Sequence, residues 1–232
     1  MNYFIFNNIN SKDMGIRINK LPPRVFPMEK KELIEVSGRD GYLTVKENAY
    51  MPITLIVECS TTKEANINTI AKYLTGKGNL ILSTEADKYY EAEIINEISL
   101  TNVLLYYKTF IIEFRCQPYK KSVTSSLVNL TKGQNIIDLD STGKAYPIIE
   151  IQGNGKVELL INSKKIIIDS IVNNIKIDME LQNATSIDGL INLNNKVSGE
   201  YTHLMQGENI INYNVISGTF TTAKIKYKEA WI

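Results

Sequence analysis

Residues 53–83 read ITLIVECSTTKEANINTIAKYLTGKGNLILS and contain the signals of a strand, a helix and a second strand in succession. In residues 53–60, apolar and polar side chains alternate, which is typical of a strand with one buried face. Residues 79–83 are a second strand candidate. This order of elements predicts a helix that packs by one face against a sheet.

The expected helix carries start and stop signals. Thr61 and Glu64 have the spacing of a capping box, in which the hydroxyl and the carboxylate satisfy free backbone amides. Gly76 can adopt the left-handed conformation that ends many helices. Between them, four apolar residues recur at helical spacing and form one stripe: Ile67, Ile70, Ala71 and Leu74.

Strand patterns continue on both sides of this stretch. Residues 89–100 are a further candidate, and residues 109–118 alternate clearly. The predicted buried face of the latter comprises Phe110, Ile112, Phe114 and Cys116. Pro118 is expected to end that strand, because proline cannot donate a ladder hydrogen bond.

The character of the chain changes near residue 120. A polar stretch follows, and then about eight short strand candidates are separated by Gly, Asn and Ser, with no helical pattern. Such spacing favours a β-sandwich or jelly roll. The expected fold is therefore mainly β. Residues 1–120 form an α+β domain with one helix, and residues 121–232 form a β-sandwich. The turns that separate these strands include Gly153-Asn154-Gly155 and Ser217-Gly218, and residues 189–194 are one of the strands.

Charge and hydropathy exclude several functional classes. The formal net charge is +1, so the sequence has no electrostatic footprint for specific nucleic-acid binding. No apolar run reaches the roughly 18 residues of a membrane span, and we expect no membrane association. The first fifteen residues lack a basic segment followed by a long apolar run, so no secretory signal is expected.

Few residues of the sequence could supply a catalytic or metal-binding pattern. His203 is the only histidine and lies in a predicted loop without a nucleophile motif. Cys59 and Cys116 fall inside predicted strands and are expected to be buried reduced thiols. These spacings match no metal or cofactor motif. We therefore expect no catalytic, cofactor-binding or metal-binding residues, and no cofactor.

Asp178 and Glu180 are predicted to leave one strand on the same face. Paired carboxylates perform glycoside hydrolysis, but a solvated strand face produces such pairs routinely. The latter interpretation is favoured. Calcium binding by these carboxylates with loop asparagines lacks the expected calcium-loop motif.

Carbohydrate binding is the alternative function that the sequence leaves open. A jelly roll could stack a sugar on Trp231, Tyr201 or Tyr213 and satisfy its hydroxyls with asparagine amides. Packing of these aromatic rings in the core or at a sheet edge is the other interpretation, and it is favoured.

Residues 33–43 read LIEVSGRDGYL, in which Gly38-Arg39-Asp40-Gly41 separates two strand-like runs. We interpret this as a hairpin with Arg39 and Asp40 as its two loop residues, because glycine supplies conformations that other residues disfavour. These four residues are a structural turn or a subunit contact.

The ordered segments together resemble the siphophage distal tail protein family. The N-terminal segments are FNNINSKDMGIRINKLP, VSGRDGYL, IAKYLTGKGNLILS, YYEAEI and FIIEFRCQPY. In the second half, PIIEIQGNGKVELLIN, KIIIDSIVNNIKIDME and SGEYTHLMQGENIINY are similar to the galectin-like sandwich of that family. The resemblance covers nearly the whole chain and rests on order and spacing.

The resemblance implies a non-enzymatic structural role. Family members form a ring, usually of six copies, between the tail tube and the tail-tip hub, and DNA passes through it without specific binding. The N-terminal domains form the ring, and the C-terminal domains project outward. The chain resembles the short form without large insertions, so adhesion is expected from partners such as a receptor-binding protein. The implied location is the tail tip of a virion or prophage particle, assembled in the bacterial cytoplasm.

Overall fold

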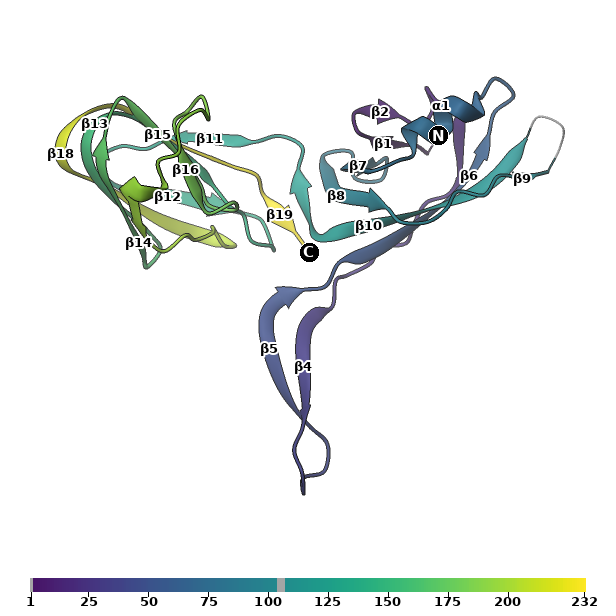
Figure 1. The fold of residues 1–232 in the computed structure, drawn as a ribbon, viewed down its shortest axis with the longest axis horizontal. Coiled ribbons are helices and arrows are strands. Elements are labelled where there is room, and N and C mark those ends of the chain that lie inside the picture. The colour runs from purple at the N-terminus through teal and green to yellow at the C-terminus, as the bar shows by residue number, and fades with distance from the viewer. Residues whose placement is uncertain (1, 104–106) are drawn as a thin grey trace. The chain divides into compact units, whose positions relative to one another are not determined.

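The computed structural model describes residues 2–103 and 107–232 and is mainly β, as predicted. Two compact units make up the chain, one of residues 1–120 with Ile232 and the other of residues 121–231. Figure 1 shows the strands of both units and the single α-helix of the described residues. Each unit has its own apolar core.

The first unit is built on a curled, antiparallel sheet. Its strands follow the spatial order β2-β1-β7-β8-β10-β6-β3, and β9 pairs with the start of β10. The bounds are β1 (Phe4–Phe6), β2 (Ile9–Asn10), β3 (Ile16–Lys20), β6 (Ile53–Thr61), β7 (Lys77–Leu82), β8 (Lys88–Ile94), β9 (Thr101–Asn102) and β10 (Lys108–Ser122).

The predicted alternation of β6 and β10 is confirmed. The two strands pair in antiparallel register from Thr109 opposite Ser60 to Cys116 opposite Ile53. The buried side chains are those that the sequence predicts: Ile53, Leu55, Val57 and Cys59 from β6, and Phe110, Ile112, Phe114 and Cys116 from β10. Phe4 and Phe6 of β1 complete this core with ring contacts to Phe114.

Helix α1 (Ile67–Tyr73) starts later than the capping-box prediction, which is wrong. Thr61 is the last residue of β6, and its hydroxyl accepts a hydrogen bond from the Lys108 amide. Asn66 is the N-cap, and its side chain accepts from the amides of Asn68 and Thr69. Because Thr61 is paired in the sheet, it cannot cap the helix, and Asn66 serves as the N-cap instead.

The buried apolar stripe of α1 differs from the predicted stripe in one residue. Ile70 and Leu74 are buried as predicted, and Ile67 is half-buried, but Ala71 is exposed and Tyr73 is buried. The Tyr73 hydroxyl donates to the Ile9 carbonyl at 2.8 Å, so its polar end is satisfied. Gly76 follows the helix with φ +79°, the left-handed conformation that was expected.

Pro118 does not end β10, which continues to Ser122. The ladder with β6 stops at Cys116, opposite Ile53. No amide hydrogen is therefore needed for that ladder at position 118, and a proline there is tolerated.

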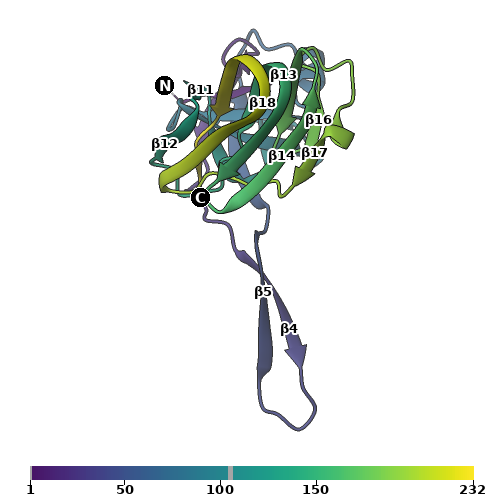
Figure 2. The same cartoon turned by 90° about the vertical axis from the view of Figure 1, so that its left-hand side faces the viewer.

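Strands β4 (Glu29–Glu35) and β5 (Tyr42–Tyr50) pair only with each other and form a separate two-stranded hairpin. Figures 1 and 2 show this hairpin extending away from the sheet of the first unit, with no other described element of that unit alongside it. Nearly every side chain in it is exposed.

The second unit contains β11 (Ser126–Asn129), β12 (Gly133–Leu139), β13 (Ile148–Ile161), β14 (Lys164–Ile171), β15 (Asn174–Asp178), β16 (Asn183–Thr185), a 3-10 turn η1 (Asn194–Lys196), β17 (Val197–Gly199), β18 (Gly207–Tyr227) and β19 (Ala230–Trp231). Within this unit, the Ser122 amide donates to the Glu229 carbonyl.

Two long strands shape this unit. β13 and β18 pair over residues 148–161 and 211–226, and each changes its outer partner along its length. The first half of β13 pairs with β15 and its second half with β14, while β18 pairs with β12 near its start and β11 near its end. The strands therefore form two layers joined at a bend, which enclose a core rich in isoleucine.

The residues predicted as turns at 153–155 and 217–218 lie at this bend, inside the strands. Gly155 faces Gly218, and the register shifts between Gln152 and Gly153 and again between Lys156 and Val157. A Cβ on Gly155 would lie 2.1 Å from the Ser217 carbonyl oxygen. Glycine is therefore required because two backbones approach closely here. In the sequence, a glycine required for this reason looks the same as a glycine in a turn.

Residues 189–194, predicted as a strand, form irregular structure with one isolated bridge from Asn192 to Thr185. Within the described residues, no helix is long and apolar enough to span a membrane.

Candidate functional site

The segment Gly38-Arg39-Asp40-Gly41 lies at the exposed tip of the β4–β5 hairpin. The predicted two-residue loop is wrong, because the last strand pair is Glu35 with Tyr42 and the loop therefore spans residues 36–41. The Arg39 amide donates to the Val36 carbonyl at 3.1 Å, which places Gly38 third in a four-residue turn. Its φ of +79° is the value that glycine allows there.

Both charged residues at this tip, Arg39 and Asp40, are exposed to solvent. Among the described residues, neither Arg39 nor Asp40 has an ion-pair partner within the chain. A Cβ on Gly38 or Gly41 would meet nothing within 4 Å. The tip therefore presents one cation and one anion that the chain itself does not neutralise.

The hairpin displays apolar side chains on both faces. Ile34 lies opposite Leu43, and Val45 lies two residues further along the same face, opposite Glu32. The other face carries Leu33 and Tyr42. All five are exposed large hydrophobic side chains. Because an isolated two-stranded hairpin is marginally stable in water, this arrangement favours a partner surface that covers it.

The base of the hairpin is held by polar and aromatic contacts. Lys31 and Lys46 lie opposite each other, and the Glu29 carboxylate lies 3.1 Å and 3.4 Å from their ammonium groups. Hydrogen bonds from Lys31 and Lys46, followed by their charges, lower the pKa of Glu29. Tyr50 packs edge to face on Tyr119 of β10, with ring centroids 5.9 Å apart. The base is therefore anchored while the tip is free.

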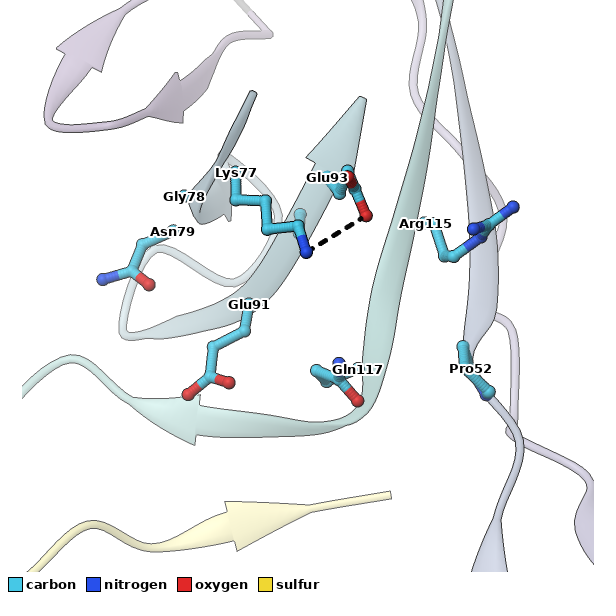
Figure 3. A pocket seen from close by; sticks show the side chains of 9 residues that line it. Pro52, Lys77, Gly78, Asn79, Glu91, Glu93, Arg115 and Gln117 are labelled. Carbon is cyan, nitrogen blue, oxygen red and sulfur yellow. Dashed lines mark ion pairs between the residues drawn. The ribbon is translucent and has the colours of Figure 1, made fainter. Parts of the chain in front are cut away.

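A groove of about 340 Å³ with several charged lining residues lies in the first unit, between β7, β8 and β10. Figure 3 shows its lining, with Glu91 and Gln117 on one side of the Lys77–Glu93 ion pair and Arg115 across from it. The Lys77 and Glu93 charges are 3.7 Å apart and exposed, so the pair contributes little stability. The described lining residues supply charge and hydrogen bonds but no nucleophile paired with a base.

The carboxylates of Asp178 and Glu180 do not form a pair. β15 ends at Asp178, whose carboxylate accepts the amides of Glu180 and Leu181 at 3.0 Å. Glu180 extends to Lys121, 2.7 Å away. Asp178 therefore stabilises a turn and Glu180 an ion pair, and the prediction that they share a strand face is wrong. The described residues contain no group of acidic, histidine or cysteine side chains placed to hold a metal.

Two of the three aromatic residues considered for sugar stacking, Tyr201 and Tyr213, pack in or against the core. Tyr213 is buried in the core of the second unit, and Tyr201 packs partly against that core. The Trp231 indole N–H donates to the Asp140 carbonyl at 3.0 Å. Within the described residues, the three rings do not form a displayed platform.

His203 packs its ring on Tyr146, with centroids 5.5 Å apart. Burial, with the nearby Lys144 charge, lowers the pKa of His203 below its ordinary value. The thiols of Cys59 and Cys116 are buried and unpaired, and burial raises the pKa of each to about 12. The prediction of buried reduced cysteines is confirmed.

Sequence reasoning missed the apolar surface of the hairpin. It predicted a hairpin with residues 38–41 at its tip, but not that both faces of its strands are apolar, although the signal was available. In residues 29–50, apolar residues occupy successive positions, which point to opposite faces of a strand, as in Leu33-Ile34 and Tyr42-Leu43. A hairpin that is apolar on both faces, yet has charged residues at its base, indicates a surface covered by another chain.

Comparisons with known proteins give one informative result. No family model matches the chain, and no curated protein matches it in sequence. In its fold, the chain is similar to the distal tail proteins of siphophages. One similar solved structure is that of Dit (gp 19.1) from phage SPP1, described as a paradigm of the hub adsorption apparatus in phages that infect Gram-positive bacteria. The TM-score is 0.79 at 11% sequence identity, and the match covers 100% of both chains. The expected resemblance is thus confirmed at the level of the fold.

Proposed function

We propose that this protein is a structural component of a phage tail tip, a ring-forming adaptor between the tail tube and the tail-tip hub. The observation that carries the proposal is the end-to-end match of both units to SPP1 Dit, because a shared two-unit arrangement is a stronger constraint than one common domain. In this role the chain binds other proteins and catalyses no reaction.

The distribution of exposed apolar residues supports assembly through the first unit. Of the large hydrophobic side chains exposed in the described residues, nine fall between Phe26 and Met51, which span the hairpin and its base. Exposed apolar surface gathered in one element marks a protein interface. A ring of six copies, closed by a repeated contact between neighbours, would cover that element in every subunit.

The proposed partners follow from the position of such a ring. They are further copies of this chain, the tail tube protein, the tail-tip hub and a receptor-binding protein. DNA passes through the ring without specific binding, which the near-neutral charge of the chain supports. The protein is located in the virion tail tip after assembly in the bacterial cytoplasm.

Electron microscopy of the purified chain tests the proposal, both alone and mixed with its tail tube and hub proteins. We expect closed rings with six-fold symmetry. A chain that remains monomeric in all of these mixtures would contradict the proposed function.

A further inference from the structure

An apolar groove of about 300 Å³ runs beside α1 in the first unit. Ile67 and Ala71 of the helix form one wall, and Ile98 and Leu100 form the other. Ala71 is exposed and Ile67 is half-buried, so part of this wall faces solvent. Most of its lining residues are aliphatic, whereas the groove between β7, β8 and β10 is lined by four charged residues. The groove beside α1 therefore suits apolar side chains of another protein surface.

The hairpin offers a surface of the same chemistry. Ile34, Leu43 and Val45 lie on one face and are each about two-fifths exposed, at 37%, 44% and 41%. Burying such side chains removes apolar area from water, which stabilises both the contact and the hairpin itself. The chain thus carries an unpartnered apolar projection and an open apolar groove.

These two features lie at opposite ends of one strand. The hairpin leads through Met51 into Ile53, the first residue of β6. The groove lies near the last residues of β6, because Leu100 precedes Thr101, and Thr101 pairs with Thr109, which pairs with Ser60. Nine residues of strand span about 30 Å. A hairpin that extends away from this sheet therefore does not reach the groove of its own subunit.

Placement at opposite ends has a consequence for assembly. When a projection on one subunit fits a recess at the far end of the next, the contact is heterologous and passes from copy to copy. Such a contact closes into a ring if its rotation permits. A two-fold contact, by contrast, would need one patch to bind itself.

We infer that the Ile34–Leu43–Val45 face of the β4–β5 hairpin occupies the groove beside α1 of a second copy of this chain. The inference rests on the proposed ring and names the surface that receives the hairpin. Ala71 and Leu43 then meet across the subunit boundary, with Ile98 and Leu100 packing on the inserted face.

Engineered cysteines test this contact directly. In the Leu43→Cys/Ala71→Cys variant, mild oxidation should produce a ladder of disulfide-linked oligomers on a non-reducing gel. The native thiols of Cys59 and Cys116 are buried with pKa values of about 12, so they do not compete. A Leu43→Cys/Ile216→Cys variant is the matched control, because Ile216 is also exposed but lies in the second unit. A ladder only in the control, or in neither, would overturn the inference.

A charge placed in the groove tests the inferred contact independently of whether the chain forms a ring. Ala71→Glu should abolish rings in electron micrographs while leaving the melting temperature of the monomer unchanged. Asn68→Glu adds the same charge at an exposed position of α1 that does not line the groove, and rings should persist. If Ala71→Glu still forms rings, the inferred contact is wrong and the proposed function stands. If the unmodified chain forms no rings with its partners and the Leu43→Cys/Ala71→Cys variant forms no ladder, both fail.

Discussion

The cysteines of the first unit illustrate how burial controls the chemistry of a single residue. Cys59 and Cys116 lie on the core face of adjacent strands, and loss of solvation raises the pKa of each thiol to about 12. At pH 8 both are protonated and unreactive. We expect a thiol reagent to modify neither cysteine in the folded protein and both in denaturant, as measured by absorbance. Rapid modification of the folded protein would contradict this burial.

Gly155 shows how one residue sets the bend of the second unit. Its φ is +133°, and an added methyl group would collide with the Ser217 carbonyl oxygen. Gly155→Ala should lower the free energy of unfolding by more than about 3 kcal/mol, measured by urea denaturation. Gly189 has φ +77° but open space around it, so Gly189→Ala should cost only about 1 kcal/mol. Equal losses would show that steric contact at the bend is unimportant.

The charged pair at the hairpin tip has no partner among the described residues of the chain, which favours a role between subunits. Replacing Arg39 and Asp40 by alanine should weaken ring assembly without changing the melting temperature. Assembly can be followed by light scattering over a range of protein concentrations. Unchanged assembly would leave residues 36–41 as a turn only.

At the scale of elements, α1 depends on its N-cap. The Asn66 side chain accepts two backbone amides, while Glu64 of the predicted capping box is exposed and lies outside the helix. Asn66→Ala should destabilise the protein by about 1 kcal/mol, and Glu64→Ala should change its stability by less than about 0.5 kcal/mol. Thermal unfolding followed by circular dichroism measures both. A larger loss of stability in Glu64→Ala than in Asn66→Ala would support the predicted capping box instead.

The elements differ in how far sequence could predict them. Alternation in β6 and β10 gave the correct buried faces, because one face of each strand meets a single core. The bend in β13 and β18 could not be predicted, since glycine at a close backbone approach has the same local signature as glycine in a turn. The prediction of where α1 starts was wrong for a related reason. Pairing of Thr61 with Ile16 is a long-range contact that local cap signals do not contain.

The candidate site was predicted only in part. The glycines of residues 38–41 identified a loop, but its length depends on the register of β4 and β5, which local patterns do not fix. The groove beside α1 combines residues from 67–75 with residues from 96–100. Only the fold brings these two segments together.

The hairpin connects the element scale to the whole molecule. It lies outside both apolar cores, so replacing residues 31–46 with an Asn-Gly turn should leave the fold intact. We expect the shortened chain to keep the melting temperature of the full chain but to remain monomeric. Rings formed by the shortened chain would show that another surface drives assembly.

The central claim concerns the whole molecule, namely that copies of this chain close into a ring. The most direct test is the mass of the assembled species in solution, measured by native mass spectrometry of the full chain. We predict a dominant species of six times the 26.3 kDa chain mass. A spectrum that shows only the single-chain mass, at every concentration and with the tail tube and hub proteins present, would contradict the account.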